Sequence, residues 1–223
     1  MKINIGCGTT LLEGFVNVDN SPTALLARLP PFVPGLLNRL SLINRDQLNF
    51  SATLRRRKKD FLYSNCLRLP LKDESVDFCY SSHMLGWCLS HNQLHAFFKE
   101  LHRVLTPGGG ARLSFFNIDL LLSDYQQHRS TIRLFDRMPL GLREFDFRDK
   151  LRFLFSRNMQ NGIPLNAETI SVFLEQYQFR EIRRLPGGET GMPSEWVEGL
   201  NLYERYEESV YIECRKEKPI SAL

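Results

Sequence analysis

The chain has 223 residues, of which 43% are hydrophobic and 24% are charged, and its formal net charge is +4. These values fit one globular domain with a sizeable core, exclude a disordered chain and give no support by themselves for a nucleic-acid partner. The five cysteines lack paired metal-ligand spacing, which predicts free thiols in a reducing, cytoplasmic location.

Two short strand-like runs follow each other at the start of the chain. Residues 3–5 form a β-prone run that ends at Gly6, and residues 15–18 form a second run that ends at Asp19. Short apolar runs bounded by turn residues are typical of buried parallel strands, and open α/β sheets bind ligands at the carboxyl ends of such strands. We therefore expect the chemistry at Gly6, Gly8 and Asp19.

Each of these three residues has a physical task. Gly6 and Gly8 allow unusual backbone angles, and free N–H groups in their turn would form a nest for an anion or carboxylate. Asp19 can accept hydrogen bonds from both hydroxyls of a ribose, and such bonds to a charged acceptor contribute roughly 1.5–3 kcal/mol. Gly-x-Gly alone is a weak signal, and the aspartate that closes the next strand strengthens it.

The run Ile-Asn-Ile-Gly-Cys-Gly, followed by Gly-Phe-Val-Asn-Val-Asp, resembles the class I S-adenosylmethionine-dependent methyltransferases, in particular their bacterial type 11-like branch. Later stretches support the resemblance in order and spacing, namely residues 65–71 with 75–78, residues 80–85 and residues 101–109. The resemblance implies an α/β fold: a Rossmann-like, seven-stranded, mostly parallel sheet with helices on both faces and a C-terminal antiparallel hairpin. It also implies S-adenosyl-L-methionine as the cofactor.

With this cofactor in view, we expect it to be held by Gly6, Cys7, Gly8, Asp19, Asn65, Cys66, Ser81 and Ser82. Relatives usually carry an acidic residue at position 65 that holds the adenine amino group. The side-chain carbonyl of Asn65 can still accept from that group, without the charge. The resemblance gives Cys66 a role through its backbone only.

The segment after Asp19 departs from a simple sheet pattern. Residues 20–43 are apolar but broken by four prolines, so they do not form a membrane span, and two short helices over 23–29 and 35–42 fit better. These helices either pack on the sheet or form a substrate lid or a membrane-surface contact. A helix over 46–53 precedes five consecutive cations at 55–59, which either end that helix in solvent or bind phosphates.

A third strand over 61–63 and a fourth over 76–81 follow. The tip of the fourth strand adjoins the glycine loop in a parallel sheet, so Ser81, Ser82 and His83 are expected near the sulfonium of the donor. His83 either takes a proton from an acceptor hydroxyl or only orients the loop.

The chain departs from its relatives after His83, because Gly86 and Trp87 stand where they commonly carry Glu-His. Trp87 could instead line the acceptor pocket. His91 and His95 have the i, i+4 spacing of metal ligands, but no third ligand is obvious. We therefore expect no metal there and a solvated polar helix face.

Periodicity and turn residues predict the remaining elements. Asp119, past the fifth strand, is expected to cap a helix in preference to meeting an acceptor. The long connection before the last strand could reach over the active site. The predicted elements are a helix over 90–105 with a capping box, a strand over 111–116, a helix capped by Asn166, and strands over 179–185 and 210–214.

We predict one methyltransferase domain over 1–223, with variable lid or acceptor-side insertions at 20–59 and 120–165. Its function would be methyl transfer from S-adenosylmethionine to a small-molecule or glycan/glycolipid acceptor, accelerated by holding both partners near contact.

Three other functions compete with this one. A nicotinamide dehydrogenase does not fit, because Gly8 and Phe15 leave no room for the long helix of its glycine motif. A non-catalytic module on the same fold stays open. A nucleic-acid methyltransferase also stays open, since residues 129–157 interleave basic and aromatic side chains.

Overall fold

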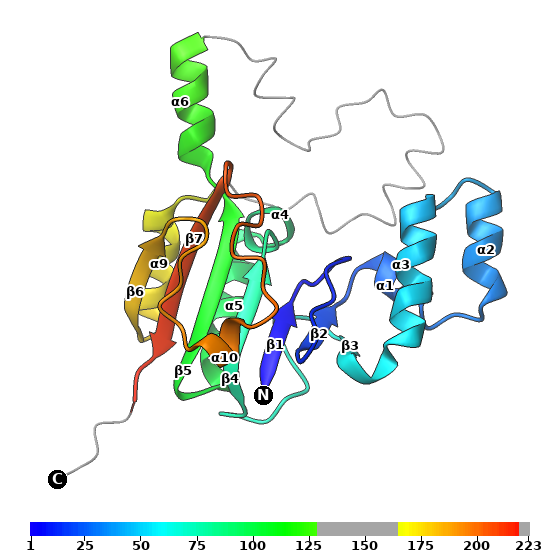
Figure 1. Ribbon diagram of the computed structural model, residues 1–223, viewed down its shortest axis with the longest axis horizontal. Helices are drawn as coiled ribbons and strands as arrows, with labels where there is room; N and C mark the ends of the chain where they lie inside the picture. Colours follow the sequence, from blue (N-terminus) through cyan, green and yellow to red (C-terminus); the bar gives the residue numbers. More distant parts are fainter. Residues whose placement is uncertain (129–164, 219–223) are drawn as a thin grey trace.

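The computed structural model describes residues 1–128 and 165–218, which form a seven-stranded sheet with helices around it (Figure 1). The strand order is β3-β2-β1-β4-β5-β7-β6, and β7 runs antiparallel to β5 and β6 while the other neighbours pair in parallel. This topology confirms the predicted Rossmann-like sheet and its closing antiparallel hairpin. The strands are β1 (Lys2–Ile5), β2 (Val16–Asp19), β3 (Phe61–Tyr63), β4 (Val76–Ser82), β5 (Leu105–Phe116), β6 (Phe179–Leu185) and β7 (Ser209–Lys216).

The parallel pairing gathers the ends of the first strands at one edge of the sheet. Ile5 pairs with Val18 of the next strand, and Asp19 pairs with Tyr63. Since β4 also runs parallel to β1, the residues that follow β1, β2, β3 and β4 come together at this edge. The predicted site residues stand in these positions.

Helices surround the sheet unevenly. The helices α5 and α9 pack on one face, where Phe97, Phe98 and Phe173 belong to the main buried cluster. The helices are α1 (Pro22–Leu26), α2 (Phe32–Arg39), α3 (Arg45–Arg56), α4 (Leu85–Cys88), α5 (His91–Val104), α6 (Ile118–His128), α9 (Ala167–Gln176) and α10 (Ser194–Val197), with a 3₁₀ turn at Lys58–Asp60.

The connection between β6 and β7 covers the other face of the sheet. Met192 and Trp196 pack against Phe15, Phe78 and Tyr80, and the Trp196 ring stacks on Phe78 with their centroids 5.7 Å apart. In the described part of the chain, this second face is covered by the connection and its four-residue helix α10. Most of the connection therefore lies on the sheet, and its end at Arg205 approaches His83, since the Ser209 hydroxyl beside His83 donates to the Arg205 carbonyl.

Several predicted boundaries were wrong. The helix expected at 35–42 is α2, which begins at Phe32, because Pro34 falls in its first turn, where a missing N–H costs no helical hydrogen bond. The helix α3 takes in Arg55 and Arg56, the first two residues of the cation run. The β5 strand begins at Leu105, and its pairing with β4 shifts register between Val76 and Phe78.

The two predicted insertions have different outcomes. The segment 20–59 forms α1, α2 and α3, which lie beyond β3 at one edge of the molecule (Figure 1). Most of the segment 120–165, including the basic and aromatic stretch at 129–157, lies outside the described residues. Asn117, and not Asp119, caps α6, since the Asn117 Oδ1 accepts from the Asp119 N–H at 3.1 Å.

Candidate functional site

A cavity of about 460 Å³ lies at the carboxyl ends of β1, β2 and β3, within the size range of small-ligand pockets. It brings together six of the predicted site residues: Gly6, Gly8, Asp19, Asn65, Cys66 and His83. These come from four segments of the chain, as expected when parallel strands deliver their following loops to one edge.

The loop after β1 turns sharply beside Met84. Gly6 has φ +68°, and a Cβ added there would stand 2.5 Å from the Met84 Cγ, so both the backbone angle and the space require glycine. The Gly6 and Cys7 N–H groups donate to the Val18 carbonyl at 2.8 and 3.1 Å. The Gly8 N–H donates to Asp19, so the expected nest of free N–H groups is wrong: the sheet and the aspartate use them.

Asp19 closes β2, and its carboxylate is largely buried at the cavity wall. Its Oδ2 accepts from the Gly8 N–H at 2.9 Å, and its Oδ1 accepts from the Ser21 N–H at 2.6 Å. A carboxylate has about four acceptor positions, so Asp19 holds two loops and can still accept two hydroxyls.

Asn65 is exposed at the rim of the same cavity, and Cys66 is half-buried beside it. The Asn65 Oδ1 accepts from the Leu67 N–H at 2.9 Å, which fixes the turn after β3. This oxygen keeps a second lone pair, so the adenine-binding role predicted for Asn65 stays a prediction.

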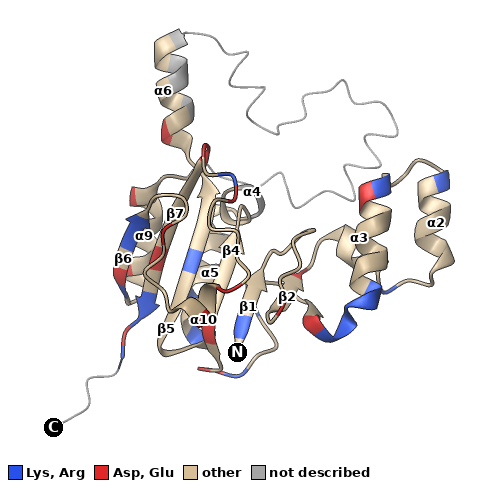
Figure 2. Cartoon of the chain, viewed as in Figure 1, with Lys and Arg blue, Asp and Glu red and all other residues tan. Residues whose placement is uncertain are grey.

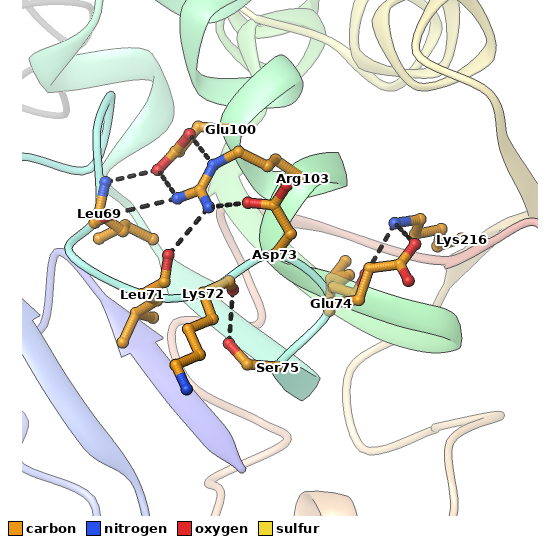
Figure 3. Close-up of polar contacts among 10 residues, drawn as sticks. Leu69, Leu71, Lys72, Asp73, Glu74, Ser75, Glu100, Arg103 and Lys216 are labelled. Carbon is orange, nitrogen blue, oxygen red and sulfur yellow. Dashed lines mark hydrogen bonds and ion pairs between the residues drawn. The ribbon is translucent and has the colours of Figure 1, made fainter.

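A partly buried ion-pair network holds the loop that carries Asn65 against α5 (Figure 3). Arg103 binds both carboxylate oxygens of Glu100 at 2.7 and 2.9 Å, and it also donates to the Leu69 and Leu71 carbonyls. Glu100 accepts in turn from the Leu69 N–H at 2.5 Å. Although burial raises the pKa of Glu100, these hydrogen bonds lower it below its ordinary value overall, so the carboxylate stays charged.

His83 follows β4 in a left-handed conformation with φ +52°. Its Nε2 lies 2.8 Å from the Ser209 Oγ, and the Ser209 hydroxyl donates to the Arg205 carbonyl at 2.6 Å. The one hydroxyl proton is thereby used, so His83 must donate from Nε2, and its lone pair sits on Nδ1. This Nδ1 is buried and has no hydrogen-bond partner among the described residues. Burial, with Arg205 nearby, lowers the pKa of His83 to about 4, against a smaller opposing effect of Glu204.

Cys7, Ser81 and Ser82 do not line this cavity. The Cys7 side chain is buried beneath the loop, and burial raises the pKa of its thiol well above the ordinary value, so a thiolate does not form there. Ser81 is fully buried within β4, and the Ser82 Oγ accepts from the Ser114 hydroxyl at 3.1 Å. The side chain of Trp87 lies outside the described part of the chain.

Sequence reasoning missed six polar residues of the lining. Three of them belong to helices, Thr23 to α1, Gln47 to α3 and Gln93 to α5, and the others are Asn20, Ser21 and Ser64. Gln93 was interpreted only as part of a capping box, which it does form with Ser90. No sequence signal placed Thr23 or Gln47 near the glycine loop, because that contact depends on how the inserted helices pack.

His91 is exposed and His95 is half-buried, so the expected solvated face is only partly present. Their rings contact each other and Phe173 of α9, and the His95 Nδ1 lies 3.1 Å from the Tyr177 hydroxyl. The pair therefore serves the packing of α5 against α9. No group of metal-ligand side chains occurs among the described residues.

The charge of the cavity lining is one-sided. Asp19 is its one carboxylate, and no lysine or arginine lines it in the described part of the chain. A ligand that carries positive charge suits this lining, whereas a polyphosphate or nucleic-acid backbone would require cations. In the described ranges, no helix has the length and apolarity needed to cross a bilayer.

Comparison with known families gives one match, to the methyltransferase domain, over residues 42–113 or about a third of the chain. Malonyl-[acyl-carrier protein] O-methyltransferase of Marinomonas sp. is 47% identical over 49 residues, which are 22% of this chain and 17% of that protein. The enzyme of the same name from Yersinia pestis is 33% identical over 84 residues, 36% of this chain and 30% of that protein. The matches thus span less than a third of these two curated relatives.

Solved structures resemble the whole fold. A methyltransferase from Methanosarcina mazei superposes with a TM-score of 0.52 at 16% identity, covering 98% of this chain and 92% of its own. The PH0226 protein of Pyrococcus horikoshii gives 0.52 at 15% identity, covering 97% and 81%. These identities show the fold alone. Together with the family match, the fold confirms the predicted resemblance to the class I S-adenosylmethionine-dependent methyltransferases, with S-adenosylmethionine as the cofactor.

Proposed function

We propose that this class I S-adenosylmethionine-dependent methyltransferase transfers a methyl group to an uncharged, hydroxyl-bearing acceptor, such as a small molecule or the glycan part of a glycolipid. The observation that carries the proposal is the cavity at the strand ends, with Asp19 as its one charged residue in the described lining. A sulfonium cation is compatible with this lining, and a ribose offers two hydroxyls to the free acceptor positions of Asp19.

The lining residues fit the cofactor in chemistry as well as in charge. Val18, Leu67 and Leu89 give apolar surface for an adenine ring, and Asn65 stands at the rim with a free lone pair for an amino group. There is no room for a side chain at Gly6 beside Met84, so a ligand in the cavity meets the Gly6 backbone directly. When bound, the cofactor supplies an electrophilic methyl group whose transfer needs no metal and no covalent nucleophile.

We assign His83 the task of orienting the acceptor. Its buried Nδ1 is a hydrogen-bond acceptor without a described partner, and an unpaired buried acceptor is unfavourable by roughly 1–3 kcal/mol unless a ligand satisfies it. A hydroxyl of the acceptor would supply that hydrogen bond. With a pKa of about 4, the imidazole is a weak base, so positioning of the acceptor is its main contribution.

The choice of acceptor follows from the neutral polar groups of the lining. Thr23, Gln47 and Gln93 offer hydroxyl and amide groups that suit a neutral hydroxylated molecule. The curated relatives are named for malonyl-[acyl-carrier protein], whose carboxylate calls for a cation that the described lining lacks. This contrast favours a sugar-like acceptor over a malonyl thioester or a nucleic acid.

Calorimetric titration with S-adenosylmethionine tests the cofactor site. We expect binding by the wild type and a loss of roughly 10- to 150-fold in affinity for Asp19→Ala, equivalent to about 1.5–3 kcal/mol. Asp60→Ala, which removes an exposed carboxylate after α3, is the matched control and should bind normally. A folded wild type that does not bind, or an equal loss in both variants, would contradict the assignment.

Methyl-labelled S-adenosylmethionine then tests the acceptor class. The labelled cofactor is incubated with the enzyme and with sugars or glycolipids, a malonyl thioester, or RNA in separate reactions. We expect label in the sugar or glycolipid fraction. Label in RNA would support a nucleic-acid methyltransferase, and a protein that binds the cofactor without labelling any acceptor would support a non-catalytic module.

A further inference from the structure

Large apolar side chains are exposed together on the helices that lie beyond β3. Phe32 of α2 is 71% exposed, and four leucines of the same stretch are also exposed. Phe32, Leu36 and the C-cap Leu40 recur every four positions along α2, so they share one face of the helix. We call this set the apolar ridge: Leu25, Leu29, Phe32, Leu36 and Leu40.

The opposite side of α2 is packed against the protein. Leu37 meets Leu26, Leu42 and Ile43 around a small gap of about 30 Å³, and Pro34 is buried. The helix is therefore held in place by its inner face, and the ridge is a second apolar face that this packing does not use. In Figure 1, α2 stands at the edge of the molecule, farther from the sheet than α3.

Positive charge accompanies the ridge. Residues 20–59 contain eight lysines and arginines and a single acidic residue, Asp46. Arg28, Arg39 and Arg45 are exposed, and Figure 2 shows basic residues at the ends of α2 and α3. Not every cation is available, because Arg55 donates to the carbonyls of Leu26, Ala27 and Leu29 and so ties α3 to α1.

We infer that the apolar ridge and its flanking arginines dock the protein on the surface of an anionic lipid membrane. Exposed phenylalanine and leucine on one helix face, with arginine beside them, are the pattern of helices that lie in a membrane interface. A ridge on a protruding helix inserts into lipid, which deforms around it, whereas a protein partner would have to offer a matching groove. Anionic headgroups complement the arginines, each worth about 1 kcal/mol near such a surface.

The gap on the inner side of α2 adjoins the cofactor cavity. Pro22, Thr23 and Gln47 line both the gap under α2 and the cavity that holds Asp19. Residues 22–47 therefore line the cavity on one side and carry the ridge on the other, which suits an acceptor with a lipid tail. This last step rests on the proposed function, whereas the docking itself does not.

Co-sedimentation with vesicles tests the docking. The wild type is expected to sediment with vesicles of phosphatidylcholine and phosphatidylglycerol, and to stay largely in solution with phosphatidylcholine alone or at high salt. Phe32→Ser with Leu36→Ser should lower vesicle affinity at least tenfold. Arg28→Glu with Arg39→Glu should abolish the preference for anionic vesicles.

The matched controls are substitutions of exposed residues far along the chain from the ridge, on α9 and β6. Val172→Ser alters an exposed apolar residue of α9, and Arg184→Glu reverses an exposed charge on β6. Both should sediment like the wild type. Titration of the same proteins with S-adenosylmethionine shows that the ridge variants are folded, and it keeps a failure of docking separate from a failure of the proposed function.

Three results would overturn the inference. The first is a wild type that binds S-adenosylmethionine but not anionic vesicles, whether the ridge is then covered by a second copy or by residues 129–164. The second is vesicle binding that survives the loss of Phe32 and Leu36. The third is an equal loss in the Val172→Ser control.

Discussion

His83 shows how the surroundings of one residue set its chemistry. Its backbone is left-handed, its Nε2 proton is donated to Ser209, and its Nδ1 is buried without a described partner. Burial and the Arg205 cation both disfavour the imidazolium, so the ring is neutral at physiological pH. Neutrality is what allows Nδ1 to accept a hydrogen bond from an acceptor molecule.

The low pKa of His83 predicts a specific acid sensitivity. A histidine whose folded pKa lies below its unfolded value of about 6.5 stabilises the fold above pH 6.5, and this stabilisation is lost as pH falls toward 4. We expect the wild type to lose about 2 kcal/mol of unfolding free energy through this group between pH 7.5 and pH 5. His83→Asn removes the titration and keeps a residue that tolerates left-handed backbone, so its loss over this range should be smaller.

Urea unfolding at several pH values measures this difference. The control is His91→Asn, which changes an exposed histidine at the start of α5 and should show the pH dependence of the wild type. If His83→Asn and the wild type lose the same free energy between pH 7.5 and pH 5, the neutral, buried state assigned to His83 is wrong.

At the scale of single residues, the sequence predicts what depends on neighbouring positions in the chain. Gly6 and Asp19 could be placed at strand ends because their strands are short and apolar. The His83–Ser209 contact joins residues 126 apart, and Thr23 reaches the cavity through the packing of α1 on α3, so no local pattern indicates either. The prediction of an anion-binding nest was wrong for a related reason. The N–H groups of Gly6, Cys7 and Gly8 already donate to Val18 and Asp19 of the neighbouring strand.

At the scale of elements, the position of the loop from β3 to β4 depends on one side chain, Arg103. Arg103 of α5 binds Glu100 and the carbonyls of Leu69 and Leu71, and it pairs with Asp73 at 2.5 Å (Figure 3). This loop has little regular structure of its own, so these bonds replace the ladder that would hold a strand. Because residues 64–67 at the start of this loop line the cavity, the position of the loop also sets one wall of the cavity.

Arg103→Met should therefore loosen this loop and destabilise the protein. The change leaves the largely buried Glu100 without its cation, and we expect a loss of about 2–4 kcal/mol in unfolding free energy, with faster amide hydrogen exchange over residues 66–71. Asp73→Asn is the control, since Asp73 is well exposed and its pair should contribute less than about 1 kcal/mol. Equal losses in the two variants would show that the network acts only through its exposed pair.

The sequence predicted elements well where one periodicity dominates. The apolar stripe of α5 and the Asn166 cap of α9 are confirmed, because each is set by residues within a few positions. The boundaries of α1 and α2 were missed, since a proline-rich apolar stretch fits several short helices and the choice between them is made by packing against α3.

On the scale of the whole molecule, a buried ion pair ties the sheet to the connection that covers it. Arg112 of β5 and Glu213 of β7 are almost fully buried and lie 2.6 Å apart on neighbouring strands. Glu213 also accepts from the Thr190 hydroxyl at 2.7 Å and the Gly191 N–H at 2.8 Å, and Arg112 donates to the Glu189 carbonyl. One pair therefore links two central strands with the layer that carries Met192 and Trp196.

Removing one partner of this pair should cost more than changing both. Arg112→Met leaves the Glu213 carboxylate charged and buried, and we expect a loss of about 3–5 kcal/mol in urea unfolding. Adding Glu213→Gln removes that charge. The amide oxygen can still accept from the Gly191 N–H, and the amide NH2 can donate to the Thr190 hydroxyl oxygen, since these two groups meet different oxygens of Glu213, so the double variant should recover part of the loss. A double variant no more stable than Arg112→Met would mean that the unpaired charge does not cause the loss of stability. The loss would then come from the missing contacts of the guanidinium with Tyr211 and the Glu189 carbonyl.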